Sequence, residues 1–425
     1  MGTAGAIDTA VKSASAVLTL GFIPLVDCAP LIVAHENGFA EAEGLSLALV
    51  RETSWANIRD RVIAGHFDAA HMLAPMPIAS SLGIGPLETP MIAPFSLGLG
   101  GNAITLSNAV YGEMQSAGAS LAAAPAEMAR ALFRVVSNRR EHGGAPLTLA
   151  VVHPFSAHNY ELRYWLAFAG VDPDRDVRIV VLPPSMMGEA IDDGQVDGFC
   201  AGEPWNSLAV DRGAGVIVAT KSALWRQGPE KVLGLRKDFA ERWPDRLHAL
   251  LRALYRAAQW AGRKEHHEEL AALLSASRYV GLPAEIIGRA LSGRLTRRKG
   301  EPAEAIPDFL VFNDHAANFP WQSHAMWFAS QMARWGQIAF SAETMQQARQ
   351  VYRPDIFRAA LAPLGVDLPR ASAKVEGALK AAMPVASRNG TMVLGPDGFF
   401  DGRLFDPDDV VGYLRGFGAA RGAAD

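Results

Sequence analysis

The sequence contains one phrase that is written twice at a fixed spacing. The stretches "GHFDAAHMLAPM" (65–76) and "GQVDGFCAGEPW" (194–205) share Gly-x-apolar-Asp, a run of small apolar residues, and Pro ten residues after the Gly. The Gly, Asp and Pro of the second copy each lie 129 residues after those of the first. The same offset separates "LTLAVVHP" (from Leu147) from "LTLGFIP" (from Leu18). Self-similarity at a constant offset indicates repeated structural units, so the chain is predicted to contain two similar halves.

Both halves alternate strand-like and helix-like segments in the same order. Strands are expected at 17–23, 45–51 and 67–73 in the first half, and at 147–152, 177–182 and 196–201 in the second. Helices are expected at about 30–43, from the Ser54 cap, from Met76, at about 159–169 and at about 185–193. This alternation predicts an α/β fold with parallel sheets and helices on both faces.

The repeated phrase predicts a cleft between two lobes. In open parallel sheets, ligands bind beyond the carboxyl ends of the strands. Each copy of the phrase is a strand followed by a loop at that end, so the two loops are expected to face each other. The Gly and Asp residues of the phrase are interpreted as helix ends and strand starts, hence as scaffold and not as site: Gly65, Asp68, Gly194 and Asp197.

The composition is that of a globular protein with room for two lobes. Of the 425 residues, 49% are hydrophobic and 20% are charged, and the net charge of -4 gives no reason to expect a nucleic-acid-binding surface. Cys28 and Cys200 lie far apart in the sequence. They are expected to be buried free thiols, because two distant cysteines suggest no disulfide framework.

The N-terminal region, "MGTAGAIDTAVKSASAVLTLGFIPLVDC", lacks the pattern of an export signal. Asp8 and a single Lys12 precede its apolar run, and Asp27 and Cys28 stand where the small residues of a cleavage site belong. No apolar stretch approaches the length of a transmembrane helix. The chain is therefore expected to be cytoplasmic, or periplasmic if an export signal is missing from this sequence.

After about residue 231 the chain is expected to return to the first lobe. An amphipathic pattern predicts helices at about 245–263 and 265–276. The predicted division is lobe 1 at 17–108 plus 231–363, lobe 2 at 109–230, and a C-terminal appendage at 364–425. Within the appendage, "LGPDGFFDGRLFDPDD" is expected to form a turn-rich hairpin.

Three motifs suggest a cofactor or a metal but fail the requirements of such sites. "GLGGNA" (98–103) has no acidic residue at the distance that a dinucleotide site needs. Neighbouring residues in "KEHHEEL" (264–270) point in different directions on a helix. "DPDRD" and "DPDD" lack the spacing of a calcium loop. No metal and no cofactor are expected.

Five segments together resemble the nitrate/bicarbonate-binding proteins, which are solute-binding subunits of anion ABC transporters. They are "GFIPLVDCAPLIVAHENGF", "ETSWANIRDRVIAGHFDAAHMLAPMP", "ELRYWLAFAGVDPDRDV", "FCAGEPWN" and "WQSHAMWFASQMARWG". The resemblance extends over roughly residues 17–363. It implies the type II periplasmic-binding-protein fold, an α/β fold with two lobes and a ligand cleft between them, in agreement with the duplication.

The resemblance implies four ligand contacts. Trp55 would offer its indole N–H at the start of a helix, and His158 would open the first helix of lobe 2. Asn102 stands where nitrate binders carry Gln beside a Gly, and in this chain Ala103 replaces that Gly. Lys231 would supply the one full positive charge. A lysine there fits nitrate or nitrite, whereas bicarbonate binders are expected to differ at this position.

Glu203, in "AGEPWN", has two readings that the sequence leaves open. It would orient His158 or Lys231, or it would stabilise the N-terminus of the helix that follows Pro204.

A branch of the resembled family that lacks export signals consists of cytoplasmic nitrate/nitrite sensors. Those proteins hold an RNA-binding antiterminator inactive until the anion binds. The expected function is therefore a sensor that binds nitrate or nitrite and releases this partner, without catalysis, direct nucleic-acid contact or membrane insertion. One alternative is the solute-binding subunit of a nitrate ABC transporter. A less favoured one is an enzyme resembling the thiamine pyrimidine synthases, which would need a cofactor lysine and histidines in one cleft.

Overall fold

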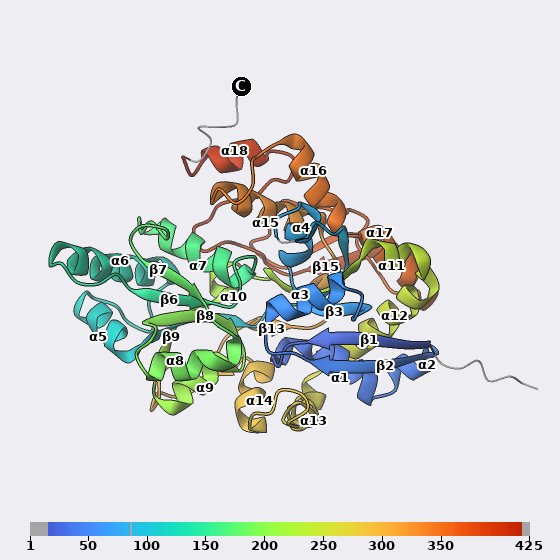
Figure 1. Ribbon diagram of the computed structural model, residues 1–425, viewed down its shortest axis with the longest axis horizontal. Coiled ribbons are helices and arrows are strands. Elements are labelled where there is room, and N and C mark those ends of the chain that lie inside the picture. Colours follow the sequence, from blue (N-terminus) through green and yellow to red (C-terminus); the bar gives the residue numbers. More distant parts are fainter. Residues whose placement is uncertain (1–15, 86, 419–425) are drawn as a thin grey trace, which may run out of the picture.

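Each half of the chain builds the centre of one lobe around a mixed sheet (Figure 1). The structure, a computed structural model, describes residues 16–85 and 87–418; residues 1–15, which carry much of the export-signal expectation, lie outside this range. The first sheet has the order β13-β4-β10-β3-β1-β2 and the second β7-β6-β8-β5-β9. The strands of the first sheet are β1 (Ala16–Phe22), β2 (Leu45–Arg51), β3 (Ala69–Leu73), β4 (Met91–Gly100), β10 (Pro229–Arg236) and β13 (Leu310–Val311). Those of the second are β5 (Asn102–Ser107), β6 (Thr148–Val151), β7 (Arg178–Val181), β8 (Gly198–Gly202) and β9 (Gly215–Thr220).

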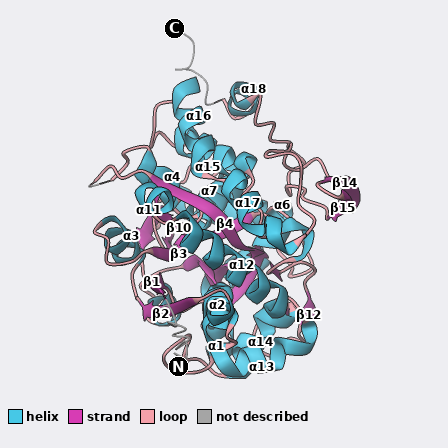
Figure 2. Cartoon of the chain, turned by 90° about the vertical axis from the view of Figure 1, so that its right-hand side faces the viewer, coloured by secondary structure: helices cyan, strands magenta, loops and turns pink. Residues whose placement is uncertain are grey.

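Helices cover both faces of the sheets (Figure 2). In the first lobe they are α1 (Ala29–Glu36), α2 (Phe39–Ala42), α3 (Trp55–Ile63), α4 (Met76–Ser81), α11 (Lys237–Arg242), α12 (Pro244–Ala261), α13 (His267–Leu274), α14 (Ala284–Ser292), α15 (Gln322–Arg334), α16 (Ala342–Val351) and α17 (Pro354–Leu361). In the second lobe and its borders they are α5 (Asn108–Ser116), α6 (Pro125–Glu141), α7 (Ala157–Phe168), α8 (Met187–Asp192), α9 (Trp205–Arg212) and α10 (Lys221–Leu224). Among the described helices, none combines the length and the apolar character needed to cross a lipid bilayer.

Most expected elements are present, and one helix differs for a clear reason. The helix expected at about 30–43 is divided into α1 and α2, because Gly38 adopts a left-handed φ of 72° between them. Ser54 occupies the predicted N-cap position of α3, but its side chain makes no capping hydrogen bond.

The two repeated phrases occupy equivalent positions in the two sheets. Asp68 accepts the backbone N–H of Thr19 at 2.8 Å, and Asp197 accepts that of Thr148 at 2.7 Å. The strand registers also agree, since Leu20 pairs with Ala69 in the first lobe and Leu149 pairs with Gly198 in the second. Each phrase thus contains an Asp that fixes its strand to the neighbouring parallel strand, β1 in the first lobe and β6 in the second, which supports the scaffold role.

The expectation of parallel sheets is correct for three strands of each lobe and wrong for the others. β10 runs antiparallel to β3, and β5 runs antiparallel to β8. The chain crosses between the lobes twice, from β4 to β5 and from β9 to β10. A strand that arrives from the opposite lobe enters at the cleft, where the parallel strands end, and must therefore run in the opposite direction. The change of sheet lies at Gly101, before the predicted lobe limit at residue 108.

The "GLGGNA" stretch makes the first of these crossings. Gly100 and Gly101 have φ values of 76° and 87°, a region that side chains disfavour. A Cβ at Gly100 would also collide with the backbone carbonyl oxygen of Phe309. The glycines of this motif are explained by the turn between the sheets.

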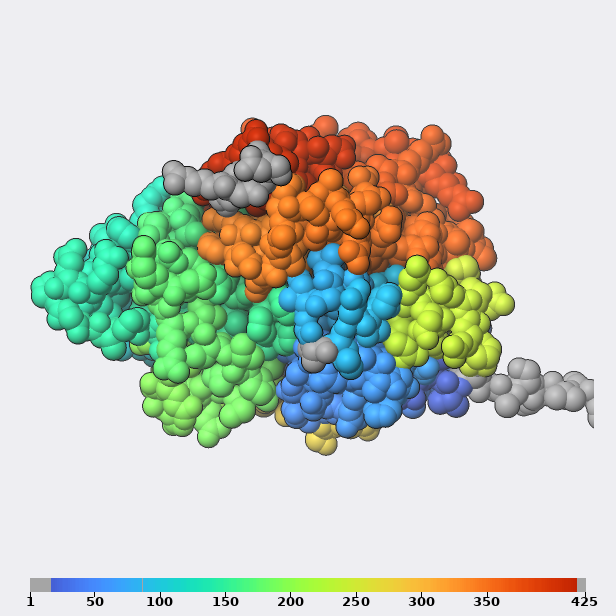
Figure 3. All heavy atoms as spheres, turned by 45° about the horizontal axis from the view of Figure 1, so that its top comes forward, coloured from blue at the N-terminus to red at the C-terminus, as the bar shows by residue number. Residues whose placement is uncertain are grey.

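The C-terminal segment packs on both lobes. Its described secondary structure consists of β14 (Met383–Ser387), β15 (Gly390–Leu394) and α18 (Val410–Arg415). Phe399 stacks on Trp225, with ring centroids 4.7 Å apart, and Asp401 accepts a hydrogen bond from Tyr164 of α7 at 2.8 Å. Figure 3 shows the red residues of this segment next to the orange residues of the first-lobe helices α15 and α16. The hairpin lies at 383–394, so most of the stretch that was expected to form it follows the hairpin instead.

Replacing Asp197 with Ala should destabilise the second lobe. The change removes a charge-assisted bond to a backbone N–H and leaves that donor without a partner, a loss of about 1.5–3 kcal/mol. Urea unfolding, monitored by circular dichroism, measures this loss in the free energy of unfolding. Asp193→Ala, at an exposed position of the same loop, is the matched control; equal midpoints for the two variants would contradict the scaffold role.

Candidate functional site

Five charged side chains form one buried network where the lobes meet. Lys231 Nζ lies 2.9 Å from Asp27 Oδ2 and 2.8 Å from Glu230 Oε1. Lys221 Nζ lies 2.9 Å from Glu230 Oε2 and also binds Glu161. All five side chains are at most 5% exposed. Glu230 therefore bridges two lysines, and each lysine contacts two carboxylates.

The crossing strands explain why these residues meet. Asn102 and Lys231 lie at the cleft ends of β5 and β10, where Asn102 pairs with Gly202 and Lys231 pairs with Leu73. Gly202 and Leu73 are 129 residues apart and hence equivalent in the duplication. The two crossing strands thus bring equivalent positions to the cleft, one from each lobe.

Trp55 and His158, two of the predicted ligand contacts, lie beside this network. Trp55 opens α3, and Lys231 Nζ is 5.5 Å from the centroid of its ring. His158, in the first turn of α7, is fully buried with Nε2 3.2 Å from Glu230 Oε1. Within the described part of the chain, Trp55 Nε1 and both ring nitrogens of His158 lack a well-aligned hydrogen-bond partner. A buried polar group without a partner costs about 1–3 kcal/mol, so their grouping here indicates a ligand site.

Asn102 is connected to the network through its amide. Its Nδ2 donates to Glu161 Oε2 at 2.9 Å. Its Oδ1 is buried and, among residues 16–85 and 87–418, has no hydrogen-bond partner. Oxygen and nitrogen of an amide exchange places by a simple flip, so Asn102 is able to present either group to a ligand.

The expectation for Lys231 requires a correction. It was predicted to be the one full positive charge of the site, yet Lys221 is a second one. Both ammonium groups are already bound by carboxylates, because a buried charge without a partner is very costly. Burial alone would lower the pKa of Lys231, but Asp27 and Glu230 raise it.

Glu203 occupies a different place from the other predicted residues. Its Oε2 accepts the N–H of Ser207 at 3.1 Å in the first turn of α9, and its backbone oxygen accepts the N–H of Val26 across the cleft at 2.9 Å. In the described chain, no hydrogen bond or ion pair joins it to His158 or Lys231. Its contacts are therefore those of the helix-terminus reading.

Burial favours the neutral form of the two histidines of the site. Burial lowers the pKa of His158 to about 3, although Glu230 opposes the shift. Burial also lowers the pKa of His71, whose Nε2 lies 3.0 Å from Asp27 Oδ1. The positive charge of the site therefore comes from the two lysines.

The carboxylates differ in their proton affinity. Burial raises the pKa of Glu161 to about 7 despite the opposing charge of Lys221. Burial also acts to raise the pKa of Glu230, but the adjacent His158 ring and the charges of Lys221 and Lys231 hold it well below its usual value. Burial raises the pKa of Glu203 to about 7, with the bonds from Ser207 opposing. Near neutral pH, Glu161 is thus the carboxylate of the network closest to its titration point.

Sequence reasoning missed five residues of this cluster, namely Asp27, His71, Glu161, Lys221 and Glu230. Some signals were present: His71 interrupts a run of small apolar residues in the first repeat, and Glu161 lies three positions after His158 on one helix. Glu230 directly precedes Lys231. Asp27 and Lys221 carry no local signal, because their importance depends on the meeting of the lobes.

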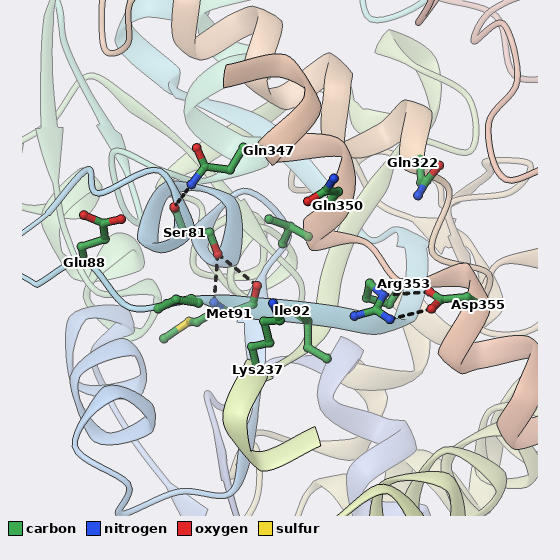
Figure 4. A pocket seen from close by; sticks show the side chains of 12 residues that line it. Ser81, Glu88, Met91, Ile92, Lys237, Gln322, Gln347, Gln350, Arg353 and Asp355 are labelled. Atoms are coloured by element: carbon green, nitrogen blue, oxygen red, sulfur yellow. Dashed lines mark hydrogen bonds and ion pairs between the residues drawn. The ribbon is translucent and has the colours of Figure 1, made fainter. Parts of the chain in front are cut away.

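A separate cavity lies on lobe 1, away from the network (Figure 4). It has a volume of about 490 Å³, and its walls come from α4, β4, α11, α15, α16 and α17. Arg353 lines it and pairs with Asp355 at 2.5 Å.

Fold and site together define a two-lobed binding protein with the α/β periplasmic-binding-protein fold. The crystal structure of the periplasmic nitrate-binding protein NrtA from Synechocystis PCC 6803 superposes with a TM-score of 0.82 at 29% identity, covering 94% of this chain and 98% of that one. The alkanesulfonate-binding protein SsuA from Xanthomonas axonopodis pv. citri shares the fold, with a TM-score of 0.52 at 16% identity over 75% of this chain and 94% of that one.

The chain belongs to the NMT1-like family, which it matches over residues 12–275, and to the group of the nitrate/nitrite binding protein NrtA. It is 31% identical to NrtA from Synechococcus elongatus over 98% of this chain and 88% of that protein. It is also 36% identical to the nitrate import ATP-binding protein NrtC from Synechocystis, over 94% of this chain and 55% of NrtC. The chain thus spans about half the length of NrtC. NrtA is a binding protein, in agreement with the expectation that this chain is not an enzyme.

Replacing Glu203 with Gln should change how stability depends on pH. A carboxyl whose pKa is raised by folding stabilises the folded state at pH values below the pKa of the unfolded chain. This stabilisation is lost as the pH rises through about 7. Glu203→Gln should therefore gain roughly 3 kcal/mol over wild type at pH 8 compared with pH 5. Thermal unfolding between pH 5 and 8 measures this, with exposed Glu189→Gln as control. Parallel pH profiles for wild type and Glu203→Gln would refute the raised pKa.

Proposed function

We propose that this protein binds nitrate or nitrite between its lobes and acts as a sensor of the anion. The observation that carries the proposal is the grouping of Trp55 Nε1 and His158 Nδ1, which are buried and have no hydrogen-bond partner among the described residues, with the ammonium of Lys231. The similarity to nitrate/nitrite binding proteins along almost the whole chain supports the same ligand class.

The chemistry of the proposed site suits a small planar oxyanion. Nitrate is a weak acceptor, so several donors around it contribute more than one strong contact. The indole N–H of Trp55, the N-terminus of α3, an N–H of His158 and the ammonium of Lys231 would surround it. The amide of Asn102, once turned, would add a further donor.

Ligand binding would favour the closed arrangement of the lobes. Trp55 and Lys231 belong to the first lobe, whereas His158 belongs to the second. An anion that contacts all three stabilises the state in which the lobes meet, and shifts the population toward it.

In the proposed sensor, this shift releases a regulatory partner, an RNA-binding antiterminator, in the cytoplasm. Linkage requires that anion and partner weaken each other's binding by the same factor. Support for a cytoplasmic location comes from the nitrate import ATP-binding protein NrtC, whose sequence includes a region similar to nearly this whole chain. ATP is a cytoplasmic metabolite, so a related module serves a protein that works where ATP is found.

The second candidate function is that of the solute-binding subunit of a nitrate ABC transporter. It is favoured by the match to NrtA, which extends over 98% of this chain and 88% of that protein.

A mixture of the protein with a labelled antiterminator distinguishes the two candidate functions. Dissociation of the complex on adding nitrate, followed by fluorescence anisotropy, is expected of the sensor. A transporter subunit would instead leave the antiterminator unbound at every nitrate concentration.

Isothermal titration calorimetry tests the ligand class directly. Nitrate and nitrite should bind with micromolar to sub-millimolar affinity, and bicarbonate more weakly, because Lys231 occupies the position expected to differ in bicarbonate binders. Absence of heat with nitrate and with nitrite at millimolar concentration would reject the proposed ligands.

Trp55→Phe should weaken nitrate binding by about 10- to 100-fold, the equivalent of one hydrogen bond to a charged group. The ring remains, so folding should persist, and thermal stability should not fall since a buried N–H without a partner is removed. Trp225→Phe is the matched control, because its Nε1 is likewise buried and unpartnered within the described chain but faces the aromatic cluster of the C-terminal segment. Equal affinities for both variants would exclude Trp55 from the site.

A further inference from the structure

We propose that the protein takes up a proton together with its anion, and that the carboxylate of Glu161 receives it. The inference rests on the proposed binding of nitrate or nitrite between the lobes and identifies Glu161 as a residue that positions the site without contacting the anion.

The charge balance of the buried network motivates the inference. Two ammonium groups, Lys221 and Lys231, face three carboxylates, those of Asp27, Glu161 and Glu230. Burial favours the neutral form of the neighbouring His71 and His158. When all three carboxylates are ionised, the network carries one net negative charge before any ligand arrives. A further anion at this buried place would face repulsion that solvent screens poorly, and a bound proton removes it.

Glu161 is the least compensated of the three carboxylates. Glu230 contacts both lysines and His158, and Asp27 contacts Lys231 and His71. Glu161 contacts the single ammonium of Lys221 and the amide of Asn102. It thus lies at one end of the network. A proton on Glu161 weakens fewer favourable contacts than a proton on Asp27 or on Glu230.

The titratable and polar groups that face Glu161 lie on α7, α10, β5, β8 and β10. Lys221 of α10 favours its ionised form, whereas Glu230 of β10 opposes it. Asn102 of β5 donates to the ionised form, and the thiol of Cys200 in β8 is close enough to have its own pKa raised, mainly by burial and further by the charge of Glu161. His158 precedes it on α7 and is neutral. Among these groups, Lys221 alone supplies a full positive charge in direct contact.

Protonation of Glu161 would also reorganise Asn102. A protonated carboxyl is a donor, and the Oδ1 atom of Asn102 is a buried acceptor without a partner among the described residues. After an amide flip, the carboxyl O–H donates to Oδ1, and Nδ2 turns from Glu161 toward the cleft. The proton therefore comes from solvent to a carboxylate oxygen, and an amide N–H becomes available to the anion. No covalent bond other than this O–H changes.

Calorimetry of the intact protein with sodium nitrate tests the inference. Nitrate itself does not titrate in the neutral range, so any proton taken up goes to the protein. At pH 8, the binding heat should differ between phosphate and Tris in proportion to their ionisation enthalpies, with a slope that approaches one proton for each nitrate. Between pH 7.5 and 8.5, the dissociation constant should rise by close to tenfold per pH unit, and it should level off below pH 6.5.

Glu161→Gln should bind nitrate with heats that do not depend on the buffer and with an affinity that no longer changes between pH 6 and 8.5. Glu203→Gln is the control, because Glu203 is a buried carboxyl with a raised pKa that makes no described bond to the network. It should retain the proton uptake of the wild type.

Buffer-independent heat for wild-type protein at pH 8 would overturn the inference, and that measurement needs no variant. Proton uptake that persists in Glu161→Gln would overturn the assignment to Glu161. Absence of nitrate binding at every pH would instead reject the proposed function, so the two failures are distinguishable.

Discussion

The antiparallel entry of two crossing strands is the constraint on which the rest of the structure depends. Each lobe is completed by a strand that comes from the other lobe, β10 in the first sheet and β5 in the second. Such a strand begins at the cleft, so its first residues are placed between the lobes without any specialised loop. Lys231 and Asn102 occupy these two positions. The hinge and the site are consequently built from the same segments, and a ligand bound there acts directly on the relation between the lobes.

The buried charges are compatible with folding because each is compensated. Lysines and carboxylates are costly to bury singly, and removing one partner of a buried pair leaves an uncompensated charge. The network around Glu230 satisfies both lysines from several elements at once. Beside it, the indole of Trp55 and the imidazole of His158 have unmet hydrogen-bonding capacity in the described structure. The site therefore combines a nearly balanced set of charges with hydrogen-bonding groups available to a ligand, and the proposed coupling of anion and proton rests on this combination.

The scaffold followed closely from the sequence, and the site followed in part. The offset of 129 residues identified Asp68 and Asp197 as equivalent, and their bonds to Thr19 and Thr148 are indeed the same. The strand directions of β5 and β10 were not predicted, because local periodicity reports the spacing of apolar residues and carries no information on direction. Trp55, Asn102, His158 and Lys231 were named through a resemblance, and the structure groups them around one network. Lys221 and Asp27 were missed because each is an ordinary charged residue in its local context.

The sequence by itself determined the duplication, the order of strands and helices in each half, and the loops that follow equivalent strands. These features follow from periodicity and self-similarity, which are properties of neighbouring residues or of a constant offset. Only the tertiary structure decided that Lys231 is held by Asp27 and Glu230, that Lys221 joins the same network, and that Glu203 serves a helix terminus. The physical reason is that the energy of a buried charge depends on all groups within a few ångströms, and those groups come from segments up to about two hundred residues apart, as Asp27 and Lys231 are.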